Sequence, residues 1–129
     1  MDDNMEKKNS RGALGRWGEQ HAANLLESAG MHIVERNWRC ARGEIDIIAI
    51  DERDLVIVEV KTRRDDNKGS ALAAVTPDKL AQLRRLAIMW LAASQRNVNI
   101  NFRAIRVDIV AITRPLQGKT RVLHVRGVE

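Results

Sequence analysis

The chain has 129 residues, 44% of them hydrophobic and 30% charged, and its 22 Lys and Arg against 17 Asp and Glu give a net charge of +5. This is the composition of one globular domain, and the longest apolar run, 86–93, excludes a membrane-spanning helix because it is too short. No apolar signal segment stands at the start and the single Cys40 cannot form an internal disulfide, so we expect a cytoplasmic protein.

The first part of the chain is predicted to be a tail followed by a helix and a strand. Residues 1–11 are polar, charged and aperiodic, so we expect a mobile tail, with a single domain from residue 12 to residue 129. From Leu14 the apolar residues recur at helical spacing, and Glu19 lies beside that apolar stripe. Residues 31–40 are predicted to form a strand that runs into a basic turn.

Two strands with unusual composition follow. The stretches "GEIDIIAI" and "LVIVEVKTR" are rich in Ile and Val, and the polar residues 51–54 stand between them. The simplest arrangement is an antiparallel hairpin with its turn at 51–54. The charged segment 62–71 contains a glycine and no periodicity, which predicts a flexible loop.

The second half of the chain predicts a helix and two further strands. The helix spans 76–94, with Thr76 as N-cap and Pro77 at the first helical position. Residues 102–112 and 120–128 read as strands. The order helix, strands, helix, strands predicts an α/β or α+β fold in which helices pack on the faces of a sheet.

The hairpin places charged side chains opposite one another. A symmetric turn puts Asp46 opposite Glu59 and Glu44 opposite Lys61, and strand alternation puts all four on one face. Opposed carboxylates only about 5 Å apart repel each other, and partial burial adds a cost on the order of several kcal/mol per ion. Some partner is therefore expected to neutralise Asp46 and Glu59.

The spacing of the four charged residues favours neither of two interpretations over the other. One is a divalent cation site, in which oxygen ligands favour Mg²⁺ or Mn²⁺ over zinc. The other is a ladder of ion pairs, in which Glu44 pairs with Lys61 while Arg36 or Arg39 reaches the opposed carboxylates. A shift of one residue in register would weaken the first interpretation, because it would separate the two carboxylates onto opposite faces.

The positive net charge suits a polyanionic partner such as nucleic acid. Candidate phosphate contacts flank the hairpin or begin the second helix: Arg36, Arg39, Arg42, Arg63, Arg64, Lys68 and Lys79. Each has an alternative as an ordinary solvated charge, and for Trp38, which could stack on a base, a place in the core is favoured. Four other arginines are expected to be surface charge: Arg84, Arg85, Arg103 and Arg106.

The hairpin resembles a known nuclease signature. "GEIDIIA" followed by "VIVEVKTR" is similar to the Asp…Glu-x-Lys pattern of the restriction-endonuclease-like superfamily. More closely, the chain resembles the YraN family of bacterial proteins, related by fold to Holliday junction resolvases. The similarity includes "GRWGEQHAANLLESAG", "ERNWR" and "KGSALAAVTPDKLAQLRRLAIMWL", although Ile57 and "RVDIV" stand where that family usually has aromatic residues. The fold implied is a mixed central β-sheet flanked by α-helices.

The resemblance also implies roles for five residues. Asp46 and Glu59 would be metal ligands, helped by the backbone carbonyl of Val60. Lys61 would orient or activate the attacking water, or stabilise the charge that builds on the phosphate. Glu19 resembles the acid that resolvases of this superfamily contribute from their first helix; by position alone, a solvated helix residue is the favoured interpretation.

The function expected is that of a Mg²⁺- or Mn²⁺-dependent endonuclease that hydrolyses phosphodiester bonds in DNA, with branched DNA as one candidate substrate. The first alternative is a nucleic-acid-binding module on the same fold that does not cleave. The second is a protein-interaction subunit in which the acids belong only to a salt-bridge ladder. A homodimer would suit the two-fold symmetry of four-way junctions, and no membrane partner is expected.

Overall fold

The computed structural model describes the backbone of residues 3–65, 73, 75–94 and 101–129, and side chains from residue 12 onward within those ranges. Two helices and five strands are present in this part of the chain. In chain order they are α1 (Asp3–Ser28), β1 (His32–Cys40), β2 (Gly43–Asp51), β3 (Asp54–Arg63), α2 (Pro77–Ala93), β4 (Ala104–Thr113) and β5 (Arg121–Val125).

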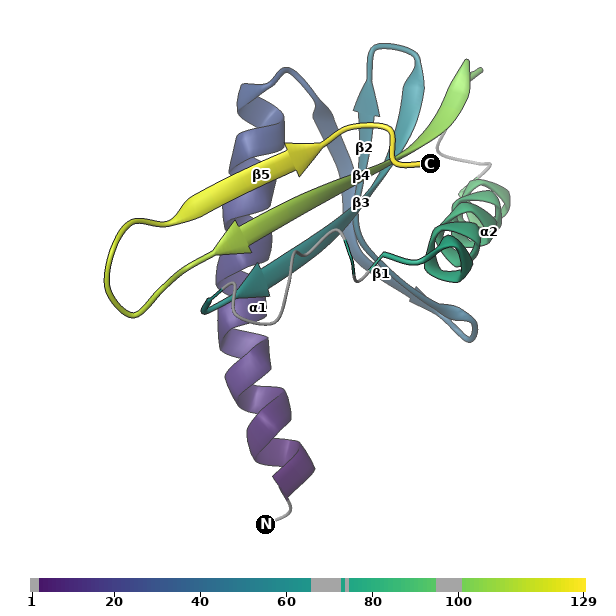
Figure 1. Ribbon diagram of the computed structural model, residues 1–129. Coiled ribbons are helices and arrows are strands. Elements are labelled where there is room, and N and C mark those ends of the chain that lie inside the picture. Colours follow the sequence, from purple (N-terminus) through teal and green to yellow (C-terminus); the bar gives the residue numbers. More distant parts are fainter. Residues whose placement is uncertain (1–2, 66–72, 74, 95–100) are drawn as a thin grey trace.

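The strands form one mixed sheet in the order β1-β2-β3-β4-β5. All neighbours are antiparallel except β3 and β4, which are parallel and are joined through α2. Figure 1 shows α1 passing behind the sheet and α2 lying at its side, near the turn of the β1–β2 hairpin. The α/β class predicted from the sequence is confirmed, and the arrangement is consistent with a restriction-endonuclease-like fold.

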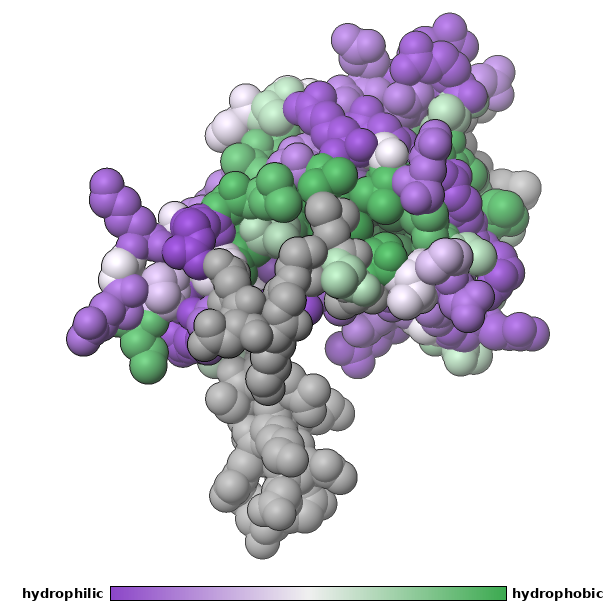
Figure 2. Space-filling model, in the orientation of Figure 1, coloured by the Kyte–Doolittle hydropathy of each residue, from purple (hydrophilic) through white to green (hydrophobic). Residues whose placement is uncertain are grey.

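Each helix covers its own hydrophobic cluster. Ala22 and Leu26 of α1 pack with Ile47 and Val58 from the strands, while Leu83 and Trp90 of α2 pack with a second set that includes Ile48 and Ile57. Alternating side chains of β2 and β3 therefore enter two cores, as expected for a sheet covered on both faces. In the orientation of Figure 1, hydrophobic side chains form a band across the middle of the surface and hydrophilic side chains flank it (Figure 2).

The boundaries of the elements differ from prediction mainly at the ends. α1 begins at Asp3, so the start predicted near Leu14 was wrong; the mobility predicted for residues 1–11 is a separate property and stays a prediction. α2 begins as predicted, with the Thr76 side chain accepting a hydrogen bond from the backbone N–H of Lys79 at 3.1 Å. Most of the predicted loop 62–71, including Lys68, lies outside the described residues. No helix in the described part is long and apolar enough to cross a membrane.

The predicted register of the hairpin is confirmed over five pairs, from Asp51↔Asp54 to Ile47↔Val58, where the pairing of β2 with β3 ends. Beyond that point β2 stays paired with β1 alone. Strand alternation would place Ile45 on the same face as Ile47, but Ile45 is buried in the cluster on the α2 side. The alternation rule assumes an evenly twisted ribbon, and it fails where β2 leaves β3 to pack on α2.

A buried ionic cluster lies at the end of β3 opposite to Lys61. Arg106, predicted to be surface charge, is only 19% exposed and forms ion pairs with Asp51 and Asp108 at 3.0 and 2.9 Å. The fully buried carboxylate of Asp108 also contacts His124 Nε2 at 2.9 Å and accepts from the Gly127 N–H at 3.0 Å. The prediction failed because sequence position does not reveal which arginines of a strand end face inward.

Candidate metal and nucleic-acid site

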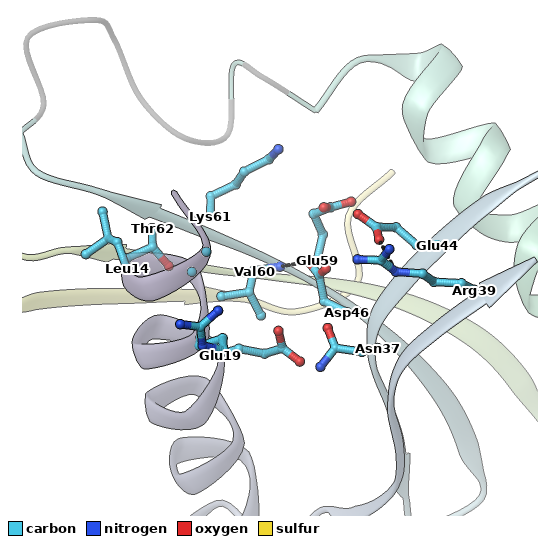
Figure 3. Close-up of a pocket in the computed structure, with 13 residues that line it drawn as sticks. Leu14, Glu19, Asn37, Arg39, Glu44, Asp46, Glu59, Val60, Lys61 and Thr62 are labelled. Carbon is cyan, nitrogen blue, oxygen red and sulfur yellow. Dashed lines mark hydrogen bonds and ion pairs between the residues drawn. The ribbon is translucent and has the colours of Figure 1, made fainter. Parts of the chain in front are cut away.

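The departure of β2 from β3 opens a cleft of about 660 Å³ between these strands and α1. Its lining comes from both faces of the sheet and from α1, and Figure 3 shows ten of its side chains labelled. The lining residues are Gly12, Leu14, Gly15, Arg16, Glu19, Asn37, Arg39, Glu44, Asp46, Glu59, Val60, Lys61 and Thr62. Every residue predicted to be catalytic or to bind metal therefore lines one cavity.

The gap between the strands is held open by a side chain. The Val60 N–H donates to Asp46 Oδ2 at 2.8 Å, where a continued ladder would instead have paired Val60 with Ile45 (Figure 3). Ile45 is drawn away because it packs against Leu83 and Leu86 of α2. Since the N–H and C=O of one strand residue point to the same side, the carbonyl of Val60 faces the same gap as Asp46.

Asp46 and Glu59 interact across the cleft, although the ladder that predicted them as a pair ends one pair earlier, at Ile47 and Val58. Burial, followed by the negative charge of Glu59, raises the pKa of Asp46 from its ordinary 3.8 to about 7. Glu59 itself is 9% exposed, and its Oε2 lies 3.5 Å from the Nζ of Lys79 on α2. Without a metal, the excess negative charge is therefore moderated by a proton on Asp46 and by one lysine.

Glu19 completes the acidic wall from the helix side. Its pKa is raised by burial, an effect that the charge of Arg36 and a hydrogen bond with Asn37 oppose. The Oε1 atom of Glu19 lies 3.7 Å from the Nε of Arg36, yet neither buried atom has a hydrogen-bond partner in the described part of the chain. The favoured positional interpretation, a solvated helix residue, was wrong, since Glu19 is 8% exposed.

Glu19 reaches the strands because α1 touches β3 at a glycine. A Cβ atom on Gly18 would lie 2.9 Å from the Cβ of Thr62, closer than side-chain packing allows. Gly15, one turn earlier on the same helix, has no neighbour within 4 Å of such an atom. The contact between Gly18 and Thr62 thus fixes the distance of Glu19 from the cleft.

We expect Gly18→Ala to lower the free energy of unfolding by about 1–3 kcal/mol, since overpacking displaces helix and strand. Gly15→Ala is the matched control, and it should raise stability by about 0.5–1 kcal/mol because alanine is the better helix former and meets no clash. Urea unfolding of both variants measures whether each substitution lowers or raises the free energy of unfolding. Equal effects in the two variants would contradict a close contact at Gly18.

The ladder interpretation is only partly matched by the ion pairs observed. Glu44 pairs with Arg39 at 3.1 Å, not with Lys61, and both partners are largely exposed. Arg36 reaches Glu19 and also donates to the side chain of Gln20 at 2.9 Å. No arginine in the described part forms an ion pair with Asp46 or Glu59.

The predicted basic residues divide into two groups. Arg36 and Arg39 are held by acids of the cleft wall, whereas Arg63 and Arg64 lie at the end of β3 just beyond Lys61, half-buried and exposed respectively. The Lys61 side chain lines the cleft, and in Figure 3 it extends from β3 toward the side on which Glu59 lies. Trp38 packs at the margin of the α2 core, as the favoured interpretation predicted.

The oxygen atoms in the cleft suit a hard divalent cation that keeps part of its water shell. They do not form a site in which protein side chains enclose the metal ion. No group of three or more His, Cys, Asp or Glu side chains in the described part is arranged to enclose a metal ion. Mg²⁺ needs no such cage, since one or two carboxylates with waters and phosphate oxygens complete its shell. Asp46, Glu59 and the Val60 carbonyl provide that kind of partial oxygen set.

Asn37 is a site residue that the sequence interpretation missed. It stands in β1 with a φ of 55°, and its side chain faces Glu19 across the cleft (Figure 3). Asparagine tolerates this left-handed conformation better than most residues, so an Asn inside a predicted strand was the available signal. The positive φ turns its amide toward the acids.

Comparison with known proteins finds similarity along most of the chain. Residues 18–112 match the family described as "Uncharacterised protein family UPF0102". A UPF0102 protein of Kineococcus radiotolerans is 50% identical over 92% of this chain and 95% of its own, and one of Streptomyces coelicolor is 50% identical over 93% and 91%. A third, from Streptomyces griseus subsp. griseus, is 49% identical over 93% of this chain and 98% of its own.

Proposed function

This chain belongs to the uncharacterised protein family UPF0102, the YraN family that its sequence resembles, and from the geometry of its cleft we propose that it is a divalent-metal-dependent nuclease acting on DNA. The observation that carries the proposal is the pairing of Asp46 and Glu59 in one cleft, beside the carbonyl side of Val60. Two buried carboxylates that repel each other are a costly arrangement, and binding a cation would relieve it.

The roles of the residues follow from where they lie. A bound Mg²⁺ or Mn²⁺ would lower the pKa of a water, orient the phosphate and stabilise negative charge. Asp46 and Glu59 would hold the ion, with Val60 contributing its carbonyl oxygen. Lys61 stands two residues beyond Glu59 on the cleft wall, where its ammonium group would orient the attacking water or stabilise the phosphoryl oxygens. Glu19 would position a water on the α1 side.

Lys79 would have one role without the metal ion and another with it. Its ammonium group, 3.5 Å from Glu59, neutralises the carboxylate in the absence of a metal. A divalent ion at Glu59 would displace Lys79, which would then be available for a phosphate oxygen. DNA, including branched DNA, is the substrate proposed, in the cytoplasm; a homodimer remains the assembly predicted for two-fold symmetric junctions.

A binding module that does not cleave is the second candidate. It is favoured by one observation: Glu59 and Glu19 each already have a cationic partner, Lys79 and Arg36. On this alternative the cleft would recognise DNA through its basic rim, and the acids would serve structure alone.

One experiment separates the two candidates. Mn²⁺ binding is measured by calorimetry, and cleavage is measured on duplex, single-stranded and four-way-junction DNA. We expect Lys61→Met to bind Mn²⁺ as the wild type does and to cleave about 100-fold more slowly, because Lys61 acts on the phosphate and not on the ion.

Lys119→Met, in the exposed connection before β5, is the matched control and should keep both properties. Mn²⁺ binding without cleavage of any substrate by the wild type would favour the binding module. Absence of Mn²⁺ binding would refute the metal site itself.

A further inference from the structure

A second cleft, of about 460 Å³, lies between the β1–β2 turn and residues 78–89 of α2. Its lining is polar at the rim and apolar at the base: Arg42, Asp78, Lys79, Gln82, Arg85, Leu86 and Met89. Three cations against one acid leave this small surface with a net charge of +2. Such a surface favours an anionic occupant.

The two arginines of this cleft are exposed and uncommitted. Among the residues that the structure describes, no carboxylate lies within ion-pair distance of Arg42 or Arg85, in contrast to Arg36 and Arg39 at the acidic cleft. Guanidinium groups bind phosphate oxygens with two parallel hydrogen bonds and lose little hydration in doing so. Arg42 and Arg85 are therefore the cations of the cleft best suited to a phosphodiester.

The turn that carries Arg42 is fixed against α2. Gln82 Nε2 donates to the carbonyl of Arg42 at 3.3 Å, and a Cβ atom on Gly43 would lie only 3.0 Å from that same nitrogen. The packing of Ile45 on Leu86 holds the adjoining strand. The spacing between the backbone positions of Arg42 and Arg85 is thus largely set before any ligand arrives, which lowers the entropic cost of binding.

Lys79 connects this cleft with the acidic one. It lines the second cleft, and its Nζ lies 3.5 Å from Glu59, which lines the first. A chain of phosphates that places one phosphate at Asp46 and Glu59 would meet Lys79 next, and then Arg42 and Arg85. Leu86 and Met89 provide an apolar floor on which sugar rings can pack.

We infer that the cleft formed by Arg42, Lys79 and Arg85 binds the sugar–phosphate backbone of the DNA strand next to the phosphate held in the acidic cleft. This inference rests on the proposed function, since it takes its direction from that site. It assigns substrate binding to Arg42 and Arg85, one of which was expected to be plain surface charge.

The test compares two double variants that lose the same charge. Arg42→Gln/Arg85→Gln removes the free guanidinium groups of the cleft. Arg53→Gln/Lys119→Gln removes two exposed cations from the β2–β3 turn and the β4–β5 connection, neither of which lines either cleft. Binding of fluorescein-labelled 20-nucleotide single strands and 20-base-pair duplexes is followed by anisotropy in EDTA over a range of salt concentrations.

We expect the cleft variant to bind about tenfold more weakly near 0.1 M salt and its salt slope to fall by about 1.5, as for two lost phosphate contacts. The control variant should keep the affinity of the wild type within about twofold. Equal weakening of both variants would overturn the inference, and so would displacement of the DNA by polyglutamate as readily as by unlabelled DNA.

The comparison of DNA binding between the two double variants does not depend on whether the acidic cleft binds a metal ion. Mn²⁺ calorimetry on Arg42→Gln/Arg85→Gln should give the same affinity as the wild type, because neither arginine touches Asp46 or Glu59. A wild type that binds DNA but no Mn²⁺ would refute the nuclease proposal and still leave the comparison of the two variants decisive for the cleft.

Discussion

Replacing Asp46 with Asn is expected to weaken Mn²⁺ binding by more than about 100-fold and, at the same time, to stabilise the metal-free protein at pH 8. The first effect follows from losing a charged ligand. The second effect follows because burial and the charge of Glu59 raise the pKa of Asp46 to about 7, so the ionised carboxylate is unfavourable at pH 8. A neutral Asn removes that cost. Asn keeps an oxygen that can accept the Val60 N–H, so the gap between the strands should remain.

The pH dependence has a defined sign. A carboxyl whose folded pKa is raised above its unfolded value contributes stability that is fully present below the unfolded pKa, near 3.8, and is lost as pH rises through about 7. Wild-type protein in EDTA should therefore lose about 1–3 kcal/mol more stability than Asp46→Asn between pH 5 and pH 8. Urea unfolding at both pH values measures the difference.

Glu52→Gln, in the exposed β2–β3 turn, is the control and should behave as the wild type in both measurements. If Asp46→Asn were less stable than the wild type at pH 8, the repulsion between Asp46 and Glu59 would not be real. If it bound Mn²⁺ with unchanged affinity, Asp46 would not be a ligand. Urea unfolding and Mn²⁺ binding test these two roles of Asp46 independently, so either role can be refuted while the other stands.

The largest loss of stability is expected from Arg106→Met. The guanidinium group pairs with Asp51 and with the fully buried Asp108, and it lies 3.7 Å from Asp54. Removing it leaves at least one buried carboxylate without its cation, which costs about 3–5 kcal/mol. Chemical denaturation at pH 7 measures this loss.

Arg103→Met is the matched control. Arg103 also pairs with Asp54, at 3.0 Å, but its side chain is 64% exposed, so the expected loss is at most about 1 kcal/mol. Similar losses of unfolding free energy in the two variants would show that burial of the Arg106 ion pairs does not increase their contribution to stability.

Acid titration gives a second measure of the same cluster. Burial alone would raise the pKa of Asp108, but hydrogen bonds from Arg106, the Gly127 N–H and His124 outweigh it, so the pKa lies below its ordinary value. Stability from this group is present above pH 3.8 and is lost as pH falls through the lowered pKa. In Arg106→Met the pKa of Asp108 should rise, which moves that loss to higher pH.

The sequence was sufficient for the parts of the site that depend on local rules. A symmetric turn predicted the register of the hairpin, which is confirmed from Asp51↔Asp54 to Ile47↔Val58; Asp46 and Glu59 lie just beyond the end of that ladder. The N-cap at Thr76 was equally readable, since capping needs only neighbouring residues. These features depend on contacts between residues close in the chain.

Contacts between distant segments could not be derived in the same way. The pairing of Glu59 with Lys79 depends on where the crossover between β3 and β4 places α2, which no periodicity specifies. The move of Ile45 to the α2 core depends on competition between two neighbours for one strand. The burial of Arg106 has a similar cause: its ion pair with Asp51 of β2 depends on how the sheet places β4, although Asp108 is only two residues away on the same strand.

The hydrogen bond from Val60 to Asp46 has a consequence for how the sheet avoids self-association. Where β2 departs, the edge of β3 would offer unpaired backbone groups to the strand of another molecule, a common start of aggregation. The Asp46 side chain caps one of those groups. A redesigned protein without the acidic cleft should therefore tolerate an apolar residue at position 59, but it should aggregate on heating unless position 46 still provides an acceptor.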